Sequence, residues 1–311
     1  MNGDGGVATL AEGLRVGERV LHPYRGVAER AAALQVLRTA LASGPVPYTI
    51  HPGEWDWWCF HPDPRVPAPV RLIGPDALLD ASAAGEVSAF GLGPDELGAI
   101  CAAAGSVGWV STNDHRRERV LDASGFAPTG PAMTVFERPT SGGVPGADRL
   151  PAGFVVRSLQ GPAEASTRAD AARDAFSSTM SPAMHRARYR RFMASPAYDR
   201  RRDVVAVGPD GVIGSFAIFW PDAALSLGQL EPVGTRHDHQ RRGLAAAVIA
   251  ECLARMAAAG ITTARVCTDD PRTAAIGLYR RCGFAAVDRL RWWVRDPSRR
   301  SSTAGGVRAR S

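Results

Sequence analysis

The feature that most constrains the fold is the order of strand and helix signals between residues 152 and 296. Runs of β-branched residues alternate with helical segments that begin at a proline or an N-cap residue and end at a glycine. The clearest helix has an apolar residue at every fourth position from Leu244 to Met256 and stops at Gly260. The order β-α-α-β-β-β-α-β-α-β predicts a mixed α/β sheet. The predicted strands are 154–158, 203–208, 212–220, 225–235, 262–268 and 290–295, and the predicted helices are 162–176, 182–194, 242–259 and 271–282.

The preceding part of the chain shows a weaker version of the same pattern. Residues 139–151 are rich in Gly, Pro and Ser, which predicts a linker between two domains. Before it, a helix ends at Gly125-Phe126, much as the last helix of the chain ends at Gly283-Phe284. We interpret 14–138 as a degenerate repeat of 152–296. Its predicted elements are helices at 27–43 and 114–124 and strands at 55–61, 87–91 and 108–113, with Trp55-Asp56-Trp57-Trp58 taken as core strand.

Composition excludes several classes of function. No stretch approaches the ~20 consecutive apolar residues of a membrane span, so no membrane partner is expected. The N-terminus lacks the basic-then-apolar order of a signal peptide, and the five cysteines form no C-x-x-C pair, so a cytoplasmic protein with reduced thiols is expected. The net charge is +6, but every basic residue is arginine, a skew typical of a GC-rich bacterial genome. Part of the excess lies in 297–311, which we predict to be a disordered basic tail that binds no nucleic acid.

One strand-to-helix junction carries the features of a phosphate site. The first N–H groups of a helix are unpaired and carry partial positive charge, so they bind phosphate well. Gly243 lets the backbone approach a ligand closely, and two arginines add positive charge. On these residues alone, an ordinary helix start with exposed arginines fits equally well. The candidate residues are Gln240, Arg241, Arg242, Gly243, Leu244, Ala245 and Ala246.

The wider context resembles the GNAT (Gcn5-related N-acetyltransferase) superfamily. The family pattern Q/R-x-x-G-x-G/A is matched at Gln240, Gly243 and Ala245, between a strand and an amphipathic helix. A second pattern, a helix ending in L-Y-x-x-x-G-F, is matched from Leu278 to Phe284. The resemblance covers residues 152–296, about half of the chain.

The resemblance implies a fold, a cofactor and a domain layout. The fold is a mixed, mostly antiparallel sheet flanked by helices, here in two tandem copies. The cofactor is acetyl-CoA as co-substrate, with its pyrophosphate on the 240–246 loop and its pantetheine arm on the backbone of Val233, Gly234 and Thr235. The N-terminal copy has no such loop, and Leu121 stands at the position of Tyr279. The layout is similar to that of tandem proteins with one inactive half, such as the mycothiol synthase type.

Two side chains are candidates for the chemistry. An alkylamine has a pKa near ~10.4 and needs a base at neutral pH, and Glu231 lies just before the loop. A strand carboxylate paired with arginine is an equally good reading of Glu231. By analogy with the family, Tyr279 donates a proton to the leaving thiolate, rather than acting as a packing residue. A backbone N–H near Gly234 would polarise the acetyl carbonyl group.

Other reactive residues favour structural roles. Cys267 and Cys282 lie in apolar patterns without an adjacent base, which argues against an acyl-enzyme. His237 and His239 lack a third ligand, so no metal site is expected. The leading hypothesis is therefore transfer of acetyl from acetyl-CoA to a primary amine in a ternary complex. The alternative is a non-catalytic acetyl-CoA-binding or scaffolding protein. A small-molecule amine is the expected partner, and a homodimer is an open option. Phe176, Tyr198 and Trp220 either line the acceptor site or pack in the core.

Overall fold

The chain forms two compact units whose boundaries differ from the expected domains. The computed structural model describes residues 13–44, 50–82 and 84–298. Unit 1 consists of Met1–Ile50, Val66–Thr134 and Asp288–Ser311, and unit 2 of His51–Arg65 and Val135–Val287. The expected linker 139–151 therefore lies within unit 2. There the Thr140 hydroxyl donates to the Ile261 carbonyl oxygen at 2.7 Å. Most of the predicted basic tail, residues 299–311, lies outside the described residues.

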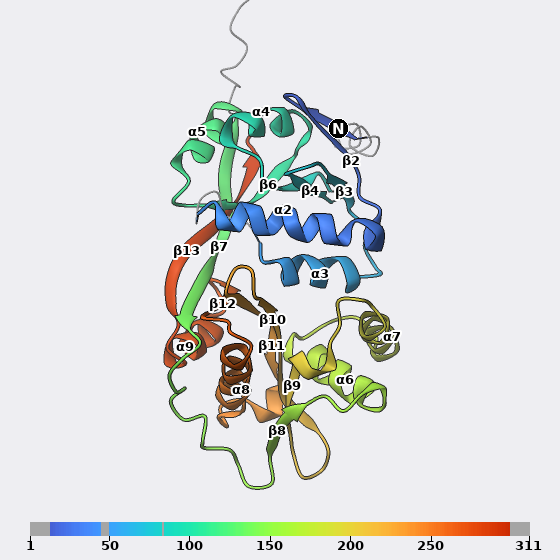
Figure 1. Ribbon diagram of the computed structural model, residues 1–311, viewed down its shortest axis with the longest axis vertical. Helices are drawn as coiled ribbons and strands as arrows, with labels where there is room; N and C mark the ends of the chain where they lie inside the picture. Colours follow the sequence, from blue (N-terminus) through green and yellow to red (C-terminus); the bar gives the residue numbers. More distant parts are fainter. Residues whose placement is uncertain (1–12, 45–49, 83, 299–311) are drawn as a thin grey trace, which may run out of the picture. The chain divides into compact units, whose positions relative to one another are not determined.

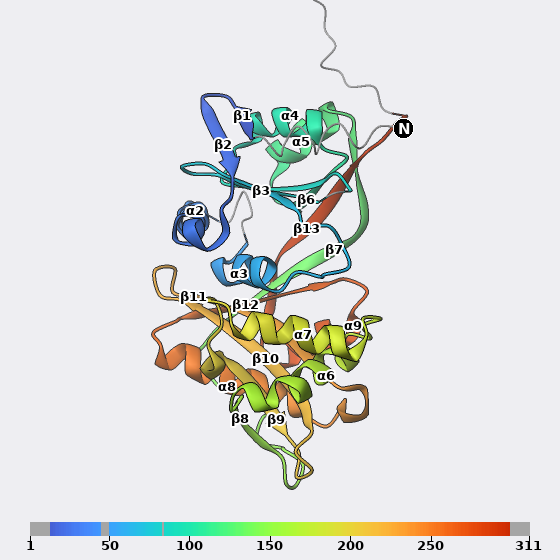
Figure 2. The same ribbon diagram turned by 90° about the vertical axis from the view of Figure 1, so that its right-hand side faces the viewer.

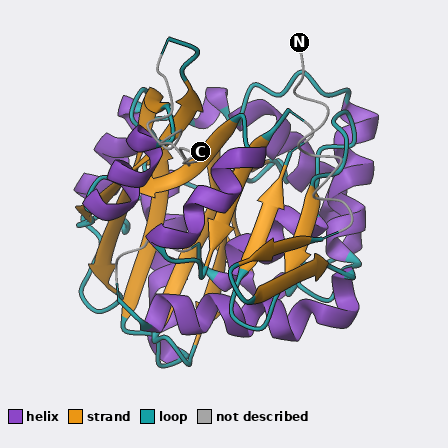
Figure 3. Ribbon diagram, turned by 90° about the horizontal axis from the view of Figure 1, so that it is seen from above, coloured by secondary structure: helices purple, strands orange, loops and turns teal. Residues whose placement is uncertain are grey.

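The described strands form a mixed sheet that is mostly antiparallel, and in Figure 3 helices lie around these strands. The hydrogen-bonded strand order is β1-β2-β3-β4-β5-β6-β13-β7-β12-β11-β10-β9-β8. Unit 1 holds β1 (Leu14–Val16), β2 (Arg19–Pro23), η1 (Gly26–Glu29), α2 (Arg30–Ala42), β3 (Val70–Ile73), β4 (Leu78–Ala81), β5 (Glu86–Phe90), α4 (Pro94–Ala103), β6 (Ser106–Ser111) and α5 (His115–Ala123). Unit 2 holds α3 (Pro52–Phe60), β8 (Val155–Ser158), η2 (Pro162–Glu164), α6 (Ala165–Ala175), α7 (Pro182–Met193), η3 (Arg200–Arg202), β9 (Asp203–Val207), β10 (Ile213–Asp222), β11 (Leu227–Thr235), η4 (His237–His239), α8 (Leu244–Ala258), β12 (Thr263–Asp269) and α9 (Thr273–Arg281). Two long strands, β7 (Phe126–Pro139) and β13 (Ala285–Arg295), contribute residues to both units.

In unit 2 the sheet separates two layers of helices. Strands β8 to β11 are antiparallel, and β12 is parallel to β11. Figure 1 shows α8 on one face of these strands and α6 and α7 on the other. Alternation along β10 supplies both cores, because neighbouring side chains point to opposite faces. Ala217 and Phe219 pack with α8, whereas Phe216, Ile218 and Trp220 pack with α6 and α7. The element order predicted for residues 152–296 is confirmed.

The prediction of a strand at 55–61 is wrong, because this segment is helix α3. Pro52 occupies the first turn, and the His51 Nδ1 accepts a hydrogen bond from the Gly53 N–H at 3.0 Å. The run Trp55-Asp56-Trp57-Trp58 was assigned to a strand because aromatic residues favour strands. Tertiary packing decides otherwise: α3 belongs to unit 2 and packs on β10 and β11 (Figure 2).

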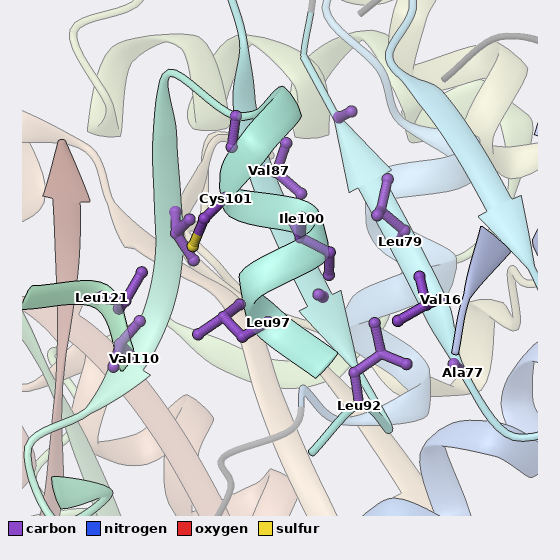
Figure 4. Close-up of a cluster of buried hydrophobic side chains, with 14 of the residues drawn as sticks. Val16, Ala77, Leu79, Val87, Leu92, Leu97, Ile100, Cys101, Val110 and Leu121 are labelled. Atoms are coloured by element: carbon purple, nitrogen blue, oxygen red, sulfur yellow. The ribbon is translucent and has the colours of Figure 1, made fainter. Parts of the chain in front are cut away.

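Unit 1 repeats the order of elements at the end of unit 2. Its order β5-α4-β6-α5-β7 matches β11-α8-β12-α9-β13, and β5 and β6 are parallel, as β11 and β12 are. Leu97 and Ile100 of α4 are buried in a core cluster with Val87 of β5 and Val110 of β6 (Figure 4). The final strands are exchanged between the units. β13 pairs with β6 in unit 1, and residues 135–139 of β7 belong to unit 2, where β7 neighbours β12 in the sheet.

Candidate active site

The predicted phosphate loop lies at the exposed start of α8, and its backbone conformation at residue 243 favours glycine. Gly243 precedes α8 with φ +82°, and no side chain caps its helix end. This φ lies in the left-handed region, where any side chain is strained. The seven predicted loop residues thus converge on one helix N-terminus, with Gln240, Arg241 and Arg242 exposed and Leu244 buried as the anchor. The start of α8 therefore faces solvent with its backbone N–H groups and two arginines.

Contacts on either side hold the loop in this conformation. Arg242 Nη1 lies 2.9 Å from His239 Nδ1, and its guanidinium stacks 5.0 Å from the centre of the Phe154 ring. The His237 N–H donates to Asp174 Oδ2 at 2.7 Å. This hydrogen bond ties the loop to the end of α6 and gives His237 a structural role. Among the described residues, no group of three or more His, Cys, Asp or Glu side chains could hold a metal ion.

Next to the loop, β11 separates from its parallel neighbour. Residues 227–229 pair with residues 263–265 of β12, but β11 continues to Thr235 without further pairs to β12. A bulge opposite β10 falls between Leu230 and Val233. A Cβ atom on Gly234 would lie 2.3 Å from Cζ of Phe216, so only glycine fits there. The half-buried residues Val233, Gly234 and Thr235 thus present a strand edge that leads to the α8 N-terminus.

Glu231 lies on this strand in surroundings that shift its titration toward neutral pH. Its carbonyl oxygen accepts a hydrogen bond from Trp220 Nε1 at 2.7 Å, which fixes the backbone at the bulge. Burial raises the pKa of the Glu231 carboxyl to about 7, against a smaller lowering by a hydrogen bond from Gln229. A carboxyl group with this pKa exchanges protons readily at neutral pH, as a general base must.

Sequence analysis missed a second carboxyl group at this site, Glu54 of α3. Its side chain is buried, and Oε2 has no hydrogen-bond partner among the described residues. Burial and the charge of Glu231 raise the pKa of Glu54 well above its ordinary value, partly offset by Arg265. The only sequence signal was an acid inside a tryptophan-rich segment, about 180 residues before the loop.

Tyr279 of α9 is buried between aromatic rings of unit 2. Its ring centre lies 6.0 Å from those of Phe136 and Phe284. Burial raises the pKa of Tyr279 above its usual value, and the charges of Cys267 and Glu231 add to the shift. The hydroxyl is therefore protonated throughout the neutral range and available as a donor.

The remaining candidates have packing roles. Gln229 Nε2 lies 3.9 Å from Cys267 Sγ, and burial raises the pKa of Cys282 to about 11, so this thiol is unreactive at neutral pH. The Tyr198 hydroxyl donates to Asp203 Oδ2 at 3.3 Å within a buried ion pair with Arg168. Trp220 is buried beside Glu231. Phe176 is exposed at the end of α6, with its ring centre 6.0 Å from that of Phe216.

Comparison with known proteins identifies the family of this site. Residues 169–284 match the model of the Acetyltransferase (GNAT) family. No curated protein sequence matches the chain. Among the described residues, no helix is both long and apolar enough to span a membrane.

Solved structures extend the likeness over most of the chain. A tandem GNAT protein from the clavulanic acid biosynthesis pathway is 13% identical with a TM-score of 0.63, over 91% of this chain and 99% of that one. A GCN5-related N-acetyltransferase from Sphaerobacter thermophilus is 19% identical with a TM-score of 0.57, over 89% of this chain and 95% of that one. A GNAT-family acetyltransferase from Colwellia psychrerythraea is 13% identical with a TM-score of 0.60, over 89% and 99%. At these identities the likeness concerns the fold. Residues 169–284, within the C-terminal half, thus match the GNAT family, and most of the chain has the fold of a tandem GNAT protein.

Proposed function

We propose, from the match of residues 169–284 to the GNAT family, that the protein is an acetyl-CoA-dependent N-acetyltransferase that acts on a primary amine. The observation that carries the proposal is the junction of β11 and α8. An open strand edge leads there to an uncapped helix N-terminus, and Glu231 precedes that edge by two residues. A cofactor with amide groups along an arm and a pyrophosphate at its end fits this combination.

The residues divide into two groups by what they would hold. Backbone N–H groups at residues 240–246, with Arg241 and Arg242, would bind the pyrophosphate. The edge of Val233, Gly234 and Thr235 would pair with the amides of the pantetheine arm. When bound, acetyl-CoA supplies an acetyl group activated as a thioester. The proton transfers and the stabilisation of the carbonyl oxygen are left to the protein's own side chains and backbone.

Two proton transfers make the chemistry balance. Glu231 removes a proton from the ammonium group of the acceptor, and the free amine attacks the acetyl carbon. As the carbon–sulfur bond breaks, the Tyr279 hydroxyl donates its proton to the sulfur. The nitrogen loses its second proton, which reprotonates Tyr279 through solvent, and Glu231 releases the first proton to solvent. A backbone N–H near Gly234 would stabilise the negative charge on the carbonyl oxygen. The products are the amide, free CoA and one proton.

The N-terminal copy is proposed to bind no acetyl-CoA. At the start of α4, the Gly93 N–H already donates to Glu96 Oε2 at 2.8 Å, and Pro94 has no N–H to offer. A carboxylate at this helix start repels phosphate. Trp292 Nε1 donates to Glu86 Oε1 at 2.5 Å, and a Cβ on Gly108 would lie 3.0 Å from that same nitrogen. Trp292 therefore covers the site between β5 and β6 that corresponds to the open edge of unit 2.

The alternative is a protein that binds acetyl-CoA without turnover. The pKa of Glu231 near neutrality and the protonated Tyr279 hydroxyl favour the enzyme, because neither is needed for binding alone. The acceptor is proposed to be a small molecule rather than nucleic acid, in a cytoplasmic setting. A homodimer remains a proposal that only a measurement in solution can test.

A turnover assay with a matched variant tests the proposal. Thiol release from acetyl-CoA is followed with a panel of primary amines, and acetyl-CoA binding is measured by calorimetry. Glu231→Gln should lower kcat/KM by ~10²–10⁴-fold with unchanged acetyl-CoA affinity. Glu251→Gln removes a carboxylate that pairs with Arg255 on α8 and should leave both quantities unchanged. Wild-type kcat/KM should fall as pH drops below about 7, because Glu231 then becomes protonated. Binding without turnover for any amine would favour the non-catalytic alternative.

A further inference from the structure

Helix α3 brings Glu54 against the part of β11 that carries Glu231. A Cβ on Gly53 would lie 2.2 Å from Cβ of Trp220, so α3 approaches β10 as closely as glycine allows. The same Trp220 donates through Nε1 to the carbonyl oxygen of Glu231. At the start of α3, His51 Nε2 lies 3.3 Å from the carbonyl oxygen of Leu227 on β11. The helix that carries Glu54 is thus held against β10 and against β11, the strand that carries Glu231.

Packing does not explain the presence of an acid at this position. Glu54 is 2% exposed, and its Oε2 atom has no hydrogen-bond partner among the described residues. A hydrogen bond from the His51 backbone lowers the pKa of Glu54, but burial and the charge of Glu231 raise it more. A buried charge that is only partly compensated is costly, so the group is held as a neutral acid or shares a proton. The cation that acts on it, Arg265 of β12, also forms an ion pair with Glu137 of β7 at 2.7 Å. Arg265 therefore cannot neutralise Glu54 fully.

We propose that Glu54 and Glu231 form a proton-sharing carboxyl pair in the acceptor site, in which Glu54 positions and tunes Glu231. The role in acetyl transfer rests on the proposed function, whereas the pair itself does not. Glu54 lies outside residues 169–284, the part of the chain that matches the family model. The proposal therefore assigns to a segment of the N-terminal half a direct part in the site of the C-terminal half.

The chemistry of such a pair defines what binds there. Two adjacent buried carboxyl groups keep one proton between them, so the pair carries a single negative charge near neutral pH. Glu54, the more deeply buried member, holds that proton and donates a hydrogen bond to the Glu231 carboxylate. The single negative charge of the pair balances the positive charge of one alkylammonium ion. The acceptor therefore binds as a monocation and gives its proton to Glu231, while Glu54 keeps its own proton throughout.

Each element packed against the pair contributes a group that sets its titration. β11 brings Glu231 itself, and β12 brings Arg265, whose charge is shared with Glu137. On α3, His51 Nδ1 accepts from the Gly53 N–H, so that nitrogen carries no proton. β10 brings Trp220, which is uncharged. The repulsion between the two glutamates is therefore opposed by Arg265, which is already paired, by a hydrogen bond from the His51 backbone to Glu54 and by one from Gln229 to Glu231.

The first test needs no acceptor and no turnover. The free energy of unfolding of the full chain is measured from pH 5 to 9 for wild type, Glu54→Gln, Glu231→Gln and the double variant. A carboxyl whose pKa is raised on folding stabilises the fold fully at low pH and loses that contribution as pH rises toward its folded value. Wild type should lose stability over this range, and Glu54→Gln should lose less.

The proposal depends on whether the titration of Glu54 changes when Glu231 is removed. In Glu231→Gln, the midpoint of the Glu54 contribution should move down by about one pH unit or more, because the repelling charge is gone. If the effect of Glu54→Gln on the pH dependence is the same with and without Glu231, the two groups do not share a proton and the proposal is overturned. All the variants in this cycle exchange a buried acid for an amide of equal size, so each should fold.

The second test measures kcat/KM against pH with acetyl-CoA and whichever primary alkylamine wild type acetylates. Glu54→Gln keeps a neutral donor, so its acidic limb should stay at the wild-type pH. Glu54→Leu lacks a donor to Glu231, so the limb should move up by about one unit and kcat/KM at pH 7 should fall roughly fivefold. Asp63→Asn makes the same acid-to-amide change in the segment after α3, where Asp63 pairs with Arg65, and should shift nothing.

The two tests separate failure of this inference from failure of the proposed function. A coupled pair in a chain that acetylates no amine leaves the inference standing and counts against the enzyme. Turnover with a wild-type pH profile in a folded Glu54→Leu overturns the inference and leaves the enzyme. If Glu54→Leu does not fold, the coupling measured with the glutamine variants decides alone.

Discussion

At the scale of single residues, Tyr279 has to donate a proton although its surroundings raise the pKa of its hydroxyl. Burial, Cys267 and Glu231 all raise the pKa of its hydroxyl, so the donor form is fully present at neutral pH. It can donate only as negative charge develops on the sulfur, because a thiol with a pKa of ~8.5 is the stronger acid at rest. Tyr279→Phe should therefore lower kcat by ~10²–10⁴-fold, with acetyl-CoA affinity nearly unchanged. Single-turnover kinetics together with calorimetry would measure both.

The variant Tyr198→Phe is the control that distinguishes a catalytic role of Tyr279 from a packing role. The Tyr198 hydroxyl lies 3.3 Å from Oδ2 of Asp203, whose carboxylate also forms the buried ion pair with Arg168. Tyr198→Phe should lower the melting temperature but leave kcat unchanged. If Tyr279→Phe kept the wild-type kcat while chemistry limited the rate, Tyr279 would be a packing residue between Phe136 and Phe284.

Residues that belong to local motifs could be identified from sequence, and residues brought in from afar could not. Gly243 and Tyr279 stand at fixed positions in short patterns, and Glu231 lies a few residues before one of them. Glu54 is close to Glu231 only because α3 folds onto β10 and β11. No spacing along the chain encodes that approach, so the second carboxyl group could only be found in the structure.

At the scale of elements, the start of α8 decides whether the cofactor binds. Gly243→Asp places a negative side chain at the exposed N-terminus, on a backbone with φ +82°. Acetyl-CoA affinity should drop by at least about 100-fold, because the added carboxylate places a negative charge at the helix N-terminus and repels the pyrophosphate. Calorimetric titration of wild type and variant with acetyl-CoA measures this change in affinity.

The other end of the same helix offers the control for this variant. Gly260 has φ +79°, with no atom within 4 Å of the place that a Cβ would take. Gly260→Asp imposes the same backbone strain and the same charge at the C-terminal end of α8. It should lower stability but not acetyl-CoA affinity. Equal losses of affinity in both variants would mean that strain, not charge at the loop, causes the effect.

The elements from β8 to β13 were predicted from local sequence signals, whereas α3, whose signals conflict, was not. The order from β8 to β13 follows from proline at helix starts, glycine at helix ends and apolar periodicity. For α3 the aromatic run favoured a strand, although Pro52 and the preceding His51 form a helix start. The buried residues of α3 include Glu54 and Asp56 among tryptophans, so the segment has no apolar helical period, and burial within unit 2 determined its conformation.

At the scale of the whole molecule, the two copies cannot be separated at a single point. The sequence predicted a tandem repeat with a linker at 139–151. The compact units instead exchange segments: α3 and residues 135–139 of β7 belong to unit 2, and residues from 288 onward belong to unit 1. Strand exchange leaves no trace in composition or periodicity, because each strand has the same local pattern whichever partner it pairs with.

This exchange predicts the fate of a fragment cut at the expected linker. Residues 152–311 lack Phe136, which is fully buried in the core of unit 2 beside Tyr279, and lack the Arg138 guanidinium that donates to the Cys282 carbonyl oxygen. Loss of one buried phenylalanine costs about 3–5 kcal/mol, a large share of the ~5–15 kcal/mol that stabilises a domain. The fragment would also expose Leu290 and Trp293 of β13, which are buried in the full chain, on an unpaired strand. It should aggregate or melt well below the full chain and bind no acetyl-CoA, although it keeps Glu231, Gly243 and Tyr279. Thermal unfolding and calorimetry on both proteins make the comparison, and a fragment as stable and as competent in binding as the full chain would show that the exchanged segments are dispensable.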